Sequence, residues 1–416
     1  MASIWFTSAP LPGHLDWGGL LKTAQALQKR GHDVRWVSEE RIRPLVEAGG
    51  VPFSAIAHSG WRWPPPPPPL PGSLVAMADP VVARYQRALD MWLDEVLVPR
   101  GVEALRALAD EIGAPDLIVT DPFLSAAALA AELLDVPLAV CGWPAMKTLN
   151  EELLFPVQKT LGKDSQERVA RLCQRFSLQG RYFAPGPTPS ILSPHLHVSY
   201  FNADWYQSDH DLLLPQTLFV GGAPDQPEGE APTWLRDIPE DAPLALITLG
   251  TTFTGDLGIF SWAAQAAARA GLIPLVVVGW NPIAPEEKAR LIAALPKSTR
   301  LLNFVSFPHV LPRTRLMIHH GGMGTTHAAV VYGVPQLVVP HAADQRGNAR
   351  RVAAAKVGLN LSAHDVQRGM LFQGARALLS DEKVWQTARR LADDFAALGG
   401  PARAADALAE LARTSD

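Results

Sequence analysis

Short apolar segments alternate with helical segments in two separate series along this chain of 416 residues. In the first series the apolar pattern predicts buried strands at Ile4–Thr7 and Val34–Val37, with a helix over Leu20–Lys29 between them. Strands that are separated by helices form βαβ units, in which the strands lie parallel in one sheet. The alternation therefore predicts an α/β fold, and the length predicts two domains of about 200 residues each.

The same alternation predicts the remaining elements of both series. Further strands are expected at Asp116–Thr120, Pro137–Cys141, Leu244–Leu249, Leu272–Val278, Leu316–His319 and Val334–Val339. Further helices are expected at Ala76–Val98, Val102–Ile112, Leu124–Leu134, Ile259–Ala270, Asn348–Lys356, Val366–Leu379, Lys383–Leu398 and Ala402–Leu411. The two series are of similar size, so the chain is predicted to consist of two α/β halves.

A stretch rich in proline, glycine and acidic residues, GGAPDQPEGEAPTWLRDIPEDAP, separates the two series. It has no hydrophobic periodicity, as is typical of a linker between domains. We therefore expect an N-terminal domain over residues 1–221, a linker over 222–243 and a C-terminal domain over 244–398. The helix within residues 399–416 is expected to pack back toward the N-terminal domain.

The composition excludes several classes of partner and compartment. A formal charge of −4 without a basic block argues against binding to nucleic acid or to an anionic membrane. Cys141 and Cys173 are the only cysteines, which argues against a disulfide framework or a cysteine-rich metal site. The N-terminus has no basic leader and no segment is apolar enough to span a membrane, so a cytoplasmic location is expected.

The most informative motif is a glycine-rich turn in the segment HHGGMGTTHAAVVYGVPQLVVPHAADQ, which runs from His319 to Gln345. Glycines between a strand and a helix let the backbone approach a ligand, and the helix start offers free N–H groups. With His320 and Thr325 as further donors, the turn is suited to a diphosphate. The spacing fits neither GxxxxGK(S/T) nor GxGxxG, so no ATPase or dinucleotide loop is predicted. The alternative is a turn that only packs tightly.

Asp344 and Gln345 follow the strand expected at Leu337–Val339, so they lie at the same carboxyl edge of the sheet. That edge is where parallel α/β sheets bind ligands. A carboxylate beside an amide suits the vicinal hydroxyls of a sugar. The alternative is a polar pair that only caps a helix.

HHGGMGTTHAAVVYGVPQLVVPHAADQRGNARRV resembles the donor-binding segment of the inverting GT-B glycosyltransferases, which use UDP- or dTDP-sugars to modify natural products, sterols and glycopeptides. PGHLDWGGLLKTAQALQKRGHDVRWVS resembles the opening of their N-terminal domain. LITLGTT and GGPARAADALAEL resemble the loop that opens their second domain and their C-terminal helix. The resemblance implies two Rossmann-like doubly wound domains that face each other across a cleft.

The resemblance also implies a catalytic pair in the N-terminal domain. His14 of PLPGH matches the family's general base, and an imidazole suits the removal of a proton from an acceptor hydroxyl. Asp121 of LIVTDPF matches the carboxylate that supports this base, by the logic of a catalytic triad. The alternatives are a solvated loop histidine and an N-cap for the helix that follows Pro122.

On the donor side, the resemblance assigns three groups of residues. The diphosphate is expected to contact Thr251, Thr252, His320, Gly322, Met323, Gly324 and Thr325. The sugar is expected at Asp344 and Gln345, and the nucleobase at Phe304 and Val305. Phe304 and Phe307 could equally be core residues. No metal and no cofactor beyond the nucleotide sugar is expected, because Asp209 and Asp211 lie outside the donor loops.

Two departures from the family pattern bear on the donor and the acceptor. Ala328 and Phe307 stand where plant-type members carry a Glu for the ribose and a Gln near the base, which leaves a dTDP-sugar open beside a UDP-sugar. The spacing between PGH and RGH is two residues longer than the usual pattern. The extra residues fall in LDWGG beside His14, where they could reshape the acceptor mouth.

Aromatic and apolar residues of the N-terminal half suggest the acceptor site. The segment WRWPPPPPPLPG is expected to be a stiff, extended loop flanked by indoles. The expected acceptor pocket comprises Trp61, Trp63, Trp92, Trp143, Met146 and Phe155. The sequence thus predicts transfer of a sugar, with inversion, to a hydroxyl of a hydrophobic small molecule. The alternatives are a nucleotide-sugar epimerase or hydrolase on the same scaffold, and a non-catalytic helper protein that keeps the fold.

Overall fold

The computed structural model describes the chain except at residues 75–76, 78–79, 143–150, 185–190, 251–256, 280–282, 342–343 and 415–416. The side chains of residues 80–81, 84–85 and 151–160 are likewise outside the description. The chain forms two compact units. Unit 1 comprises Met1–Ala203, Asp209–Val220 and Gly400–Asp416, and unit 2 comprises Asp204–Ser208 and Gly221–Gly399.

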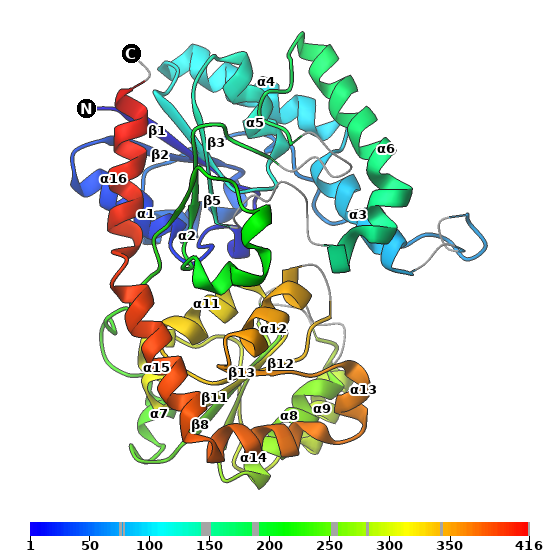
Figure 1. Ribbon diagram of the computed structural model, residues 1–416, viewed down its shortest axis with the longest axis vertical. Helices are drawn as coiled ribbons and strands as arrows, with labels where there is room; N and C mark the ends of the chain where they lie inside the picture. The colour runs from blue at the N-terminus through cyan, green and yellow to red at the C-terminus, as the bar shows by residue number, and fades with distance from the viewer. Residues whose placement is uncertain are drawn as a thin grey trace. The chain divides into compact units, whose positions relative to one another are not determined.

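The centre of unit 1 is a parallel sheet with the strand order β3-β2-β1-β4-β5-β6-β7 (Figure 1). Its central strands are buried along almost their whole length, as expected for a parallel sheet covered on both faces. The strands are β1 (Ser3–Thr7), β2 (Asp33–Ser38), β3 (Phe53–Ala55), β4 (Leu117–Thr120), β5 (Leu138–Gly142), β6 (Leu196–Ser199) and β7 (Thr217–Phe219).

Helices connect these strands. The C-terminal helix also belongs to unit 1. Helix α16, drawn in red in Figure 1, packs beside α1 near the opposite end of the chain. The helices are α1 (Leu20–Lys29), α2 (Arg43–Ala48), α3 (Pro80–Trp92), α4 (Leu97–Ile112), α5 (Ser125–Leu133), α6 (Glu151–Phe176) and α16 (Gly400–Arg413). Short 3-10 turns lie at η1 (Pro12–His14), η2 (Glu40–Ile42) and η3 (Asp204–Leu212), the last shared by both units.

Unit 2 is built on a second parallel sheet, with the order β10-β9-β8-β11-β12-β13. The strands are β8 (Leu244–Thr248), β9 (Ile273–Val277), β10 (Arg300–Leu302), β11 (Thr314–His319), β12 (Gln336–Val338) and β13 (Gly358–Asn360). The helical segments are α7 (Thr233–Arg236), α8 (Gly258–Arg269), α9 (Pro285–Ala294), α10 (Phe307–Val310), η4 (Leu311–Arg313), α11 (Met323–Val331), α12 (Asp344–Ala354), α13 (Ala363–Gln367), α14 (Met370–Ser380) and α15 (Glu382–Ala396). The predicted parallel α/β architecture is therefore confirmed in both units.

Five strands of the two sheets were not predicted: β3, β6, β7, β10 and β13. Each has only three or four residues, and β7 and β10 are half-buried along their whole length. So short a segment offers no alternation or apolar run by which a strand can be recognised. Pairing with a longer neighbour in the sheet determines these strands.

The predicted single helix over Ala76–Val98 is wrong, because the structure breaks it after Trp92. Asp94 lies in the break and is almost fully buried, at 8% exposure. Its Oδ1 accepts hydrogen bonds from the backbone N–H groups of Val96 and Leu97, both at 2.9 Å. A carboxylate that satisfies free N–H groups in this way starts a new helix.

Helix α4 accordingly begins five residues before the predicted start at Val102. Pro99 lies in its first turn, where the missing N–H removes no helical hydrogen bond. Gly101, two residues further on, lets the segment around Gly60 approach the helix closely. A Cβ on Gly101 would lie 2.7 Å from the Gly60 nitrogen and 2.8 Å from the Ala126 Cβ of α5.

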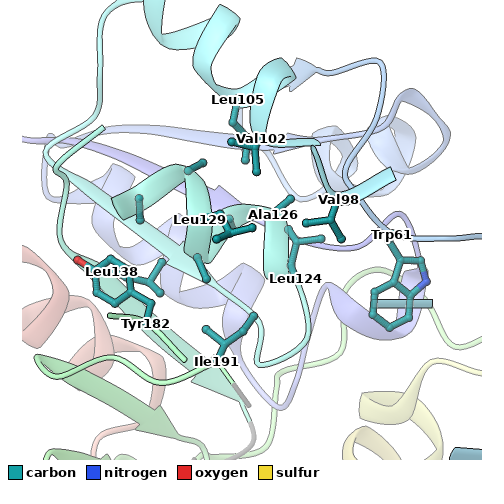
Figure 2. Close-up of a cluster of buried hydrophobic side chains, with 14 of the residues drawn as sticks. Trp61, Val98, Val102, Leu105, Leu124, Ala126, Leu129, Leu138, Tyr182 and Ile191 are labelled. Atoms are coloured by element: carbon teal, nitrogen blue, oxygen red, sulfur yellow. The ribbon is translucent and has the colours of Figure 1, made fainter. Parts of the chain in front are cut away.

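This contact joins the segment before Trp61 to the main apolar cluster of unit 1. Figure 2 shows the cluster, with Trp61 at its edge. Side chains of α4, α5, β5 and the following loops fill it; the labelled ones are Val98, Val102, Leu105, Leu124, Ala126, Leu129, Leu138, Tyr182 and Ile191. The position of Trp61 therefore depends on the close contact of Gly60 with Gly101 of α4 and with Ala126 of α5.

Within the described part of the chain, none of the helices combines the length and the apolar character that a membrane span requires.

We predict that Gly101→Ala destabilises α4 and α5 by about 1–3 kcal/mol, because an added methyl group in a close-packed contact forces the backbone apart. Gly324→Ala is the matched control: Gly324 is also helical, but nothing lies within 4 Å of an added Cβ. The control should change stability by less than about 1 kcal/mol. Hydrogen exchange of peptides that cover each helix measures both effects, and equal protection in the two variants would contradict the packing argument.

Candidate active site

The carboxyl ends of β1 and β4 bring the first group of predicted site residues together in unit 1. The two strands are parallel neighbours, and Thr7 of β1 pairs with Thr120 of β4. The chain after β1 enters the turn η1, which ends at His14, and the chain after β4 begins with Asp121. Sheet pairing therefore places side chains 107 residues apart at one edge.

His14 and Asp121 form a direct hydrogen bond, with 2.8 Å between Nδ1 and Oδ2. The Asp121 side chain is fully buried, whereas that of His14 is 15% exposed. Asp121 also accepts hydrogen bonds from the backbone N–H of Phe123, at 2.8 Å, and of Ala9, at 3.4 Å. Because a carboxylate accepts, Nδ1 of His14 carries the proton and Nε2 is left as the basic nitrogen.

Aromatic rings surround the His14 imidazole. Trp17 and Trp61 meet it edge to face, with ring centroids at 5.0 and 5.2 Å. Phe123 lies 6.3 Å from it, and Trp92 stacks on Phe123 at 4.6 Å. The predicted acceptor residues Trp61 and Trp92 are thus brought to the same wall of the site.

Trp17 and Phe123 were not predicted as site residues. Trp17 has a φ of 45°, which is unusual for a residue with a side chain, and it is 8% exposed. Its indole packs on Gly142 at the end of β5, where a Cβ would lie 2.9 Å from the indole ring. The one sequence signal for Trp17 is its place in LDWGG, directly after His14, and strained residues of this kind cluster at functional sites.

Of the other predicted acceptor residues, Trp63 is the one whose side chain the structure describes. Trp63 is 37% exposed, and the guanidinium of Arg41 lies 5.7 Å from the centre of its ring. Trp143 and Met146 fall outside the described residues, as does the side chain of Phe155.

The second group of predicted residues lies in unit 2, at the carboxyl end of β11. Strand β11 ends at His319 and helix α11 begins at Met323. His320, Gly321 and Gly322 form the turn between them. Gly321 has a φ of 90°, and a Cβ there would lie 2.8 Å from the backbone oxygen of Gln345. The turn therefore requires glycine for both conformation and space.

His320 is packed between glycines and is 7% exposed. A Cβ would lie 2.5 Å from its ring at Gly322 and 2.9 Å at Gly250. Burial lowers the pKa of His320 to about 3, helped by the neighbouring His319 and His341, so its imidazole is neutral. Its Nδ1 is buried and has no hydrogen-bond partner in the structure, and such an orphaned polar atom is what a ligand can satisfy.

His319 is a buried structural residue. Its Nδ1 accepts a hydrogen bond from the Gly321 N–H at 3.1 Å, and its Nε2 donates to Oε1 of Gln336 at 3.0 Å. Burial lowers the pKa of His319 to about 4, against the weaker effect of the Gln336 hydrogen bond. His319 thus holds the glycine turn in place through its hydrogen bond with Gly321.

Asp344 and Gln345 begin helix α12 and face the same turn. Oδ2 of Asp344 accepts hydrogen bonds from the Met323 N–H, at 3.0 Å, and from Nδ2 of Asn348, at 3.2 Å. Asn348 also donates to the Gly321 oxygen at 2.8 Å. Gln345 is 7% exposed and accepts from the His341 N–H through Oε1. Asn348 was not predicted; its only signal is its position one turn after Asp344.

The other donor-side predictions fall as follows. Thr325 is half-buried in the first turn of α11, next to Gly324, which has open space beside it. Phe304 is 62% exposed, whereas Val305 is 5% exposed and belongs to the core of unit 2. Thr251 and Thr252 fall outside the described residues.

The departures at Ala328 and Phe307 are apolar positions in the structure. Ala328 is buried in the core of unit 2, and Phe307 packs against the same core. Neither offers a polar group. Among the residues that the structure describes, no three His, Cys, Asp or Glu side chains are grouped so as to hold a metal ion.

Known proteins resemble the chain over parts or all of its length. Residues 281–411 match the family model of the erythromycin biosynthesis protein CIII-like C-terminal domain. The chain is 28% identical over 414 residues to the L-demethylnoviosyl transferase of Streptomyces niveus, which covers 98% of this chain and 97% of that protein.

Solved structures share the fold over the full length. The glycotransferase of kitacinnamycin has a TM-score of 0.75 at 21% identity and covers 99% of both chains. The spinosyn rhamnosyltransferase SpnG complexed with thymidine diphosphate has a TM-score of 0.68 at 21% identity and covers 96% of this chain and 98% of that one. The two doubly wound sheets, the family match and the full-length similarity to a sugar transferase together identify the chain as a glycosyltransferase of the GT-B fold.

Proposed function

We propose that the enzyme transfers a sugar from a UDP- or dTDP-sugar to a hydroxyl of a hydrophobic small molecule, with inversion at the anomeric carbon. The observation that carries this proposal is the 2.8 Å hydrogen bond between His14 and the fully buried Asp121. It leaves Nε2 of His14 as a base inside a wall of aromatic rings. An apolar acceptor with one reacting hydroxyl suits such a wall.

In this proposal unit 1 supplies the base. The acceptor oxygen forms the new bond to the anomeric carbon as its proton passes to Nε2 of His14. The bond from that carbon to the phosphate oxygen breaks, and its electron pair stays on the diphosphate. Asp121 stabilises the imidazolium that forms and keeps the ring in the required orientation, since its own position is fixed by two backbone N–H groups.

Unit 2 supplies the donor site. Helix α11 directs its N-terminal N–H groups and the positive end of its dipole toward the diphosphate, with Gly322, Gly324 and Thr325 beside it. The neutral His320 donates one further hydrogen bond through the nitrogen that now has no partner. Preorganised donors of this kind stabilise the charge that develops on the leaving diphosphate.

In this proposal Asp344 and Gln345 bind the sugar, and Phe304 and Val305 bind the nucleobase. Asp344 lies against the first turn of α11, so a sugar hydroxyl bound to Asp344 or Gln345 is held beside the diphosphate. Phe304 offers an exposed ring on which a nucleobase can stack, beside the backbone of Val305. The apolar Ala328 provides no partner for a ribose 2′-hydroxyl, which supports a dTDP-sugar, and the SpnG structure holds thymidine diphosphate.

We predict that His14→Ala lowers kcat/KM by at least about a hundredfold, because the acceptor hydroxyl loses its general base. Asp121→Asn should act in the same direction. The exposed His210, whose side chain is 78% exposed, provides the control His210→Ala. Chromatography of products from UDP- and dTDP-sugars with phenolic acceptors measures the rate, and NMR of the product gives the anomeric configuration. Wild-type turnover in His14→Ala would refute the assignment.

We predict that Asp344→Ala raises the donor KM about tenfold or lowers kcat, because a sugar hydroxyl loses a charged acceptor. Asp241→Ala, which removes an exposed carboxylate of the same unit, should leave both constants unchanged. Initial rates over a range of donor concentrations at saturating acceptor give the two constants. Identical donor dependence in Asp344→Ala and wild type would show that Asp344 does not hold the sugar.

We predict that unit 2 loses stability as the pH falls from about 6.5 toward 4. Burial holds the pKa of His319 at about 4 and of His320 at about 3, below the unfolded value of 6.5, so the unfolded state binds protons first. Each histidine contributes at most about 1.4 kcal/mol per pH unit in this window. His320→Asn should reduce the slope, and His364→Asn, an exposed control, should not. Urea unfolding at several pH values measures it; equal slopes would contradict the prediction.

A further inference from the structure

Unit 1 contains a pocket of about 370 Å³ beside the hexaproline segment. Glu39, His58, Trp61, Arg62, Trp63 and Pro64–Pro67 line it. The volume lies within the range of small-molecule sites and accommodates one or two rings. Neither the catalytic pair nor the donor site accounts for this pocket.

Trp61 connects the pocket to the catalytic pair. Its ring meets the His14 imidazole edge to face at 5.2 Å, and the same residue lines the pocket. Figure 2 shows its nitrogen on the side away from the other labelled side chains. Trp61 is 9% exposed, and its indole N–H has no hydrogen-bond partner in the structure. A buried N–H without an acceptor is destabilising, and an oxygen bound in the pocket would offset that cost.

Glu39 provides the complementary group. Its Oε1 accepts from both the N–H and the hydroxyl of Ser59, at 2.9 and 2.6 Å. Both bonds end on one oxygen, which leaves Oε2 as an acceptor for a hydroxyl in the pocket. The guanidinium of Arg62 is already engaged by the buried Asp94, so it does not neutralise Glu39. The pocket is therefore suited to a neutral group that donates hydrogen bonds.

Apart from His58, the remaining lining is apolar. Trp63 and the proline rings of Pro64–Pro67 offer faces on which a ring can stack. Arg41 lies over the ring of Trp63 at 5.7 Å. A ring with hydroxyl groups at its edge matches both the apolar faces and the two polar groups.

We propose that this pocket binds a hydroxylated ring of the acceptor, remote from the hydroxyl that reacts at His14. Glu39 accepts a hydrogen bond from that ring, and the Trp61 N–H donates one to its oxygen. The ring is either phenolic or a sugar that the acceptor already carries. This inference rests on the proposed function, in which the reacting hydroxyl of the acceptor lies at His14. Trp61 contacts His14 and also lines the pocket, so an acceptor that extends past Trp61 enters the pocket.

Binding without a nucleotide sugar tests the pocket by itself. Isothermal titration compares quercetin with 3-hydroxyflavone, which lacks the distal hydroxyls, and 4-nitrophenyl β-glucoside with 4-nitrophenol. Wild type should bind the hydroxylated member of at least one pair about tenfold more tightly. Glu39→Gln should abolish that preference while it keeps the oxygen that holds Ser59. The neighbouring Glu40→Gln, which removes an exposed partner of Arg43, is the control and should retain it.

The pair that shows the preference identifies the source of the ring as phenol or sugar. Equal affinity within both pairs, absence of binding, or a preference that survives Glu39→Gln would overturn the proposal. If Glu39→Gln does not fold, Trp63→Ala replaces it and should weaken binding of the preferred compound severalfold. If binding depends on Glu39 but no sugar is transferred, the pocket assignment stands and the proposed function is wrong. If sugar is transferred but acceptor binding does not depend on Glu39, the proposed function stands and the pocket assignment is wrong.

Discussion

The buried carboxylate of Asp121 is the constraint on which the site of unit 1 depends. A carboxylate removed from water must be compensated by hydrogen bonds, and Asp121 obtains them from Ala9, Phe123 and His14. Satisfying one charge thus ties the loop after β1 to the loop after β4. It also selects the tautomer of His14 that leaves Nε2 basic. Structure and proposed chemistry rest on the same three contacts.

In unit 2, the two buried histidines at the glycine-rich turn carry no charge. His319 and His320 are neutral because burial lowers the pKa of each, and Gly250 and Gly322 leave the space that the His320 ring occupies. A neutral donor and a helix start can stabilise an anionic diphosphate without a buried cation that would be destabilising in the free enzyme. Asp344 and Asn348 then fix the turn against the next helix.

The sequence pointed to several polar candidates that the structure brings together, but not to Asn348 or to the aromatic residues around His14. His14, Asp121 and His320 stand in motifs whose spacing resembles a known family, so each could be named. Trp17 and Phe123 could not, because an aromatic residue beside a site looks the same in sequence as one in the core. The break at Asp94 was missed for a related reason: a side chain that caps a helix is recognised only when the N–H groups it accepts from are known.

The sequence by itself determined the α/β class, the longer central strands and the glycine-rich turn, because these depend on local periodicity and on backbone conformations that few residues adopt. Tertiary structure alone decided the short edge strands, the 2.8 Å contact between residues 107 positions apart, and the pocket beside the prolines. Those features depend on which strands are neighbours and on which side chains are left without a partner. Both are set by packing between distant segments, for which local sequence carries no signal.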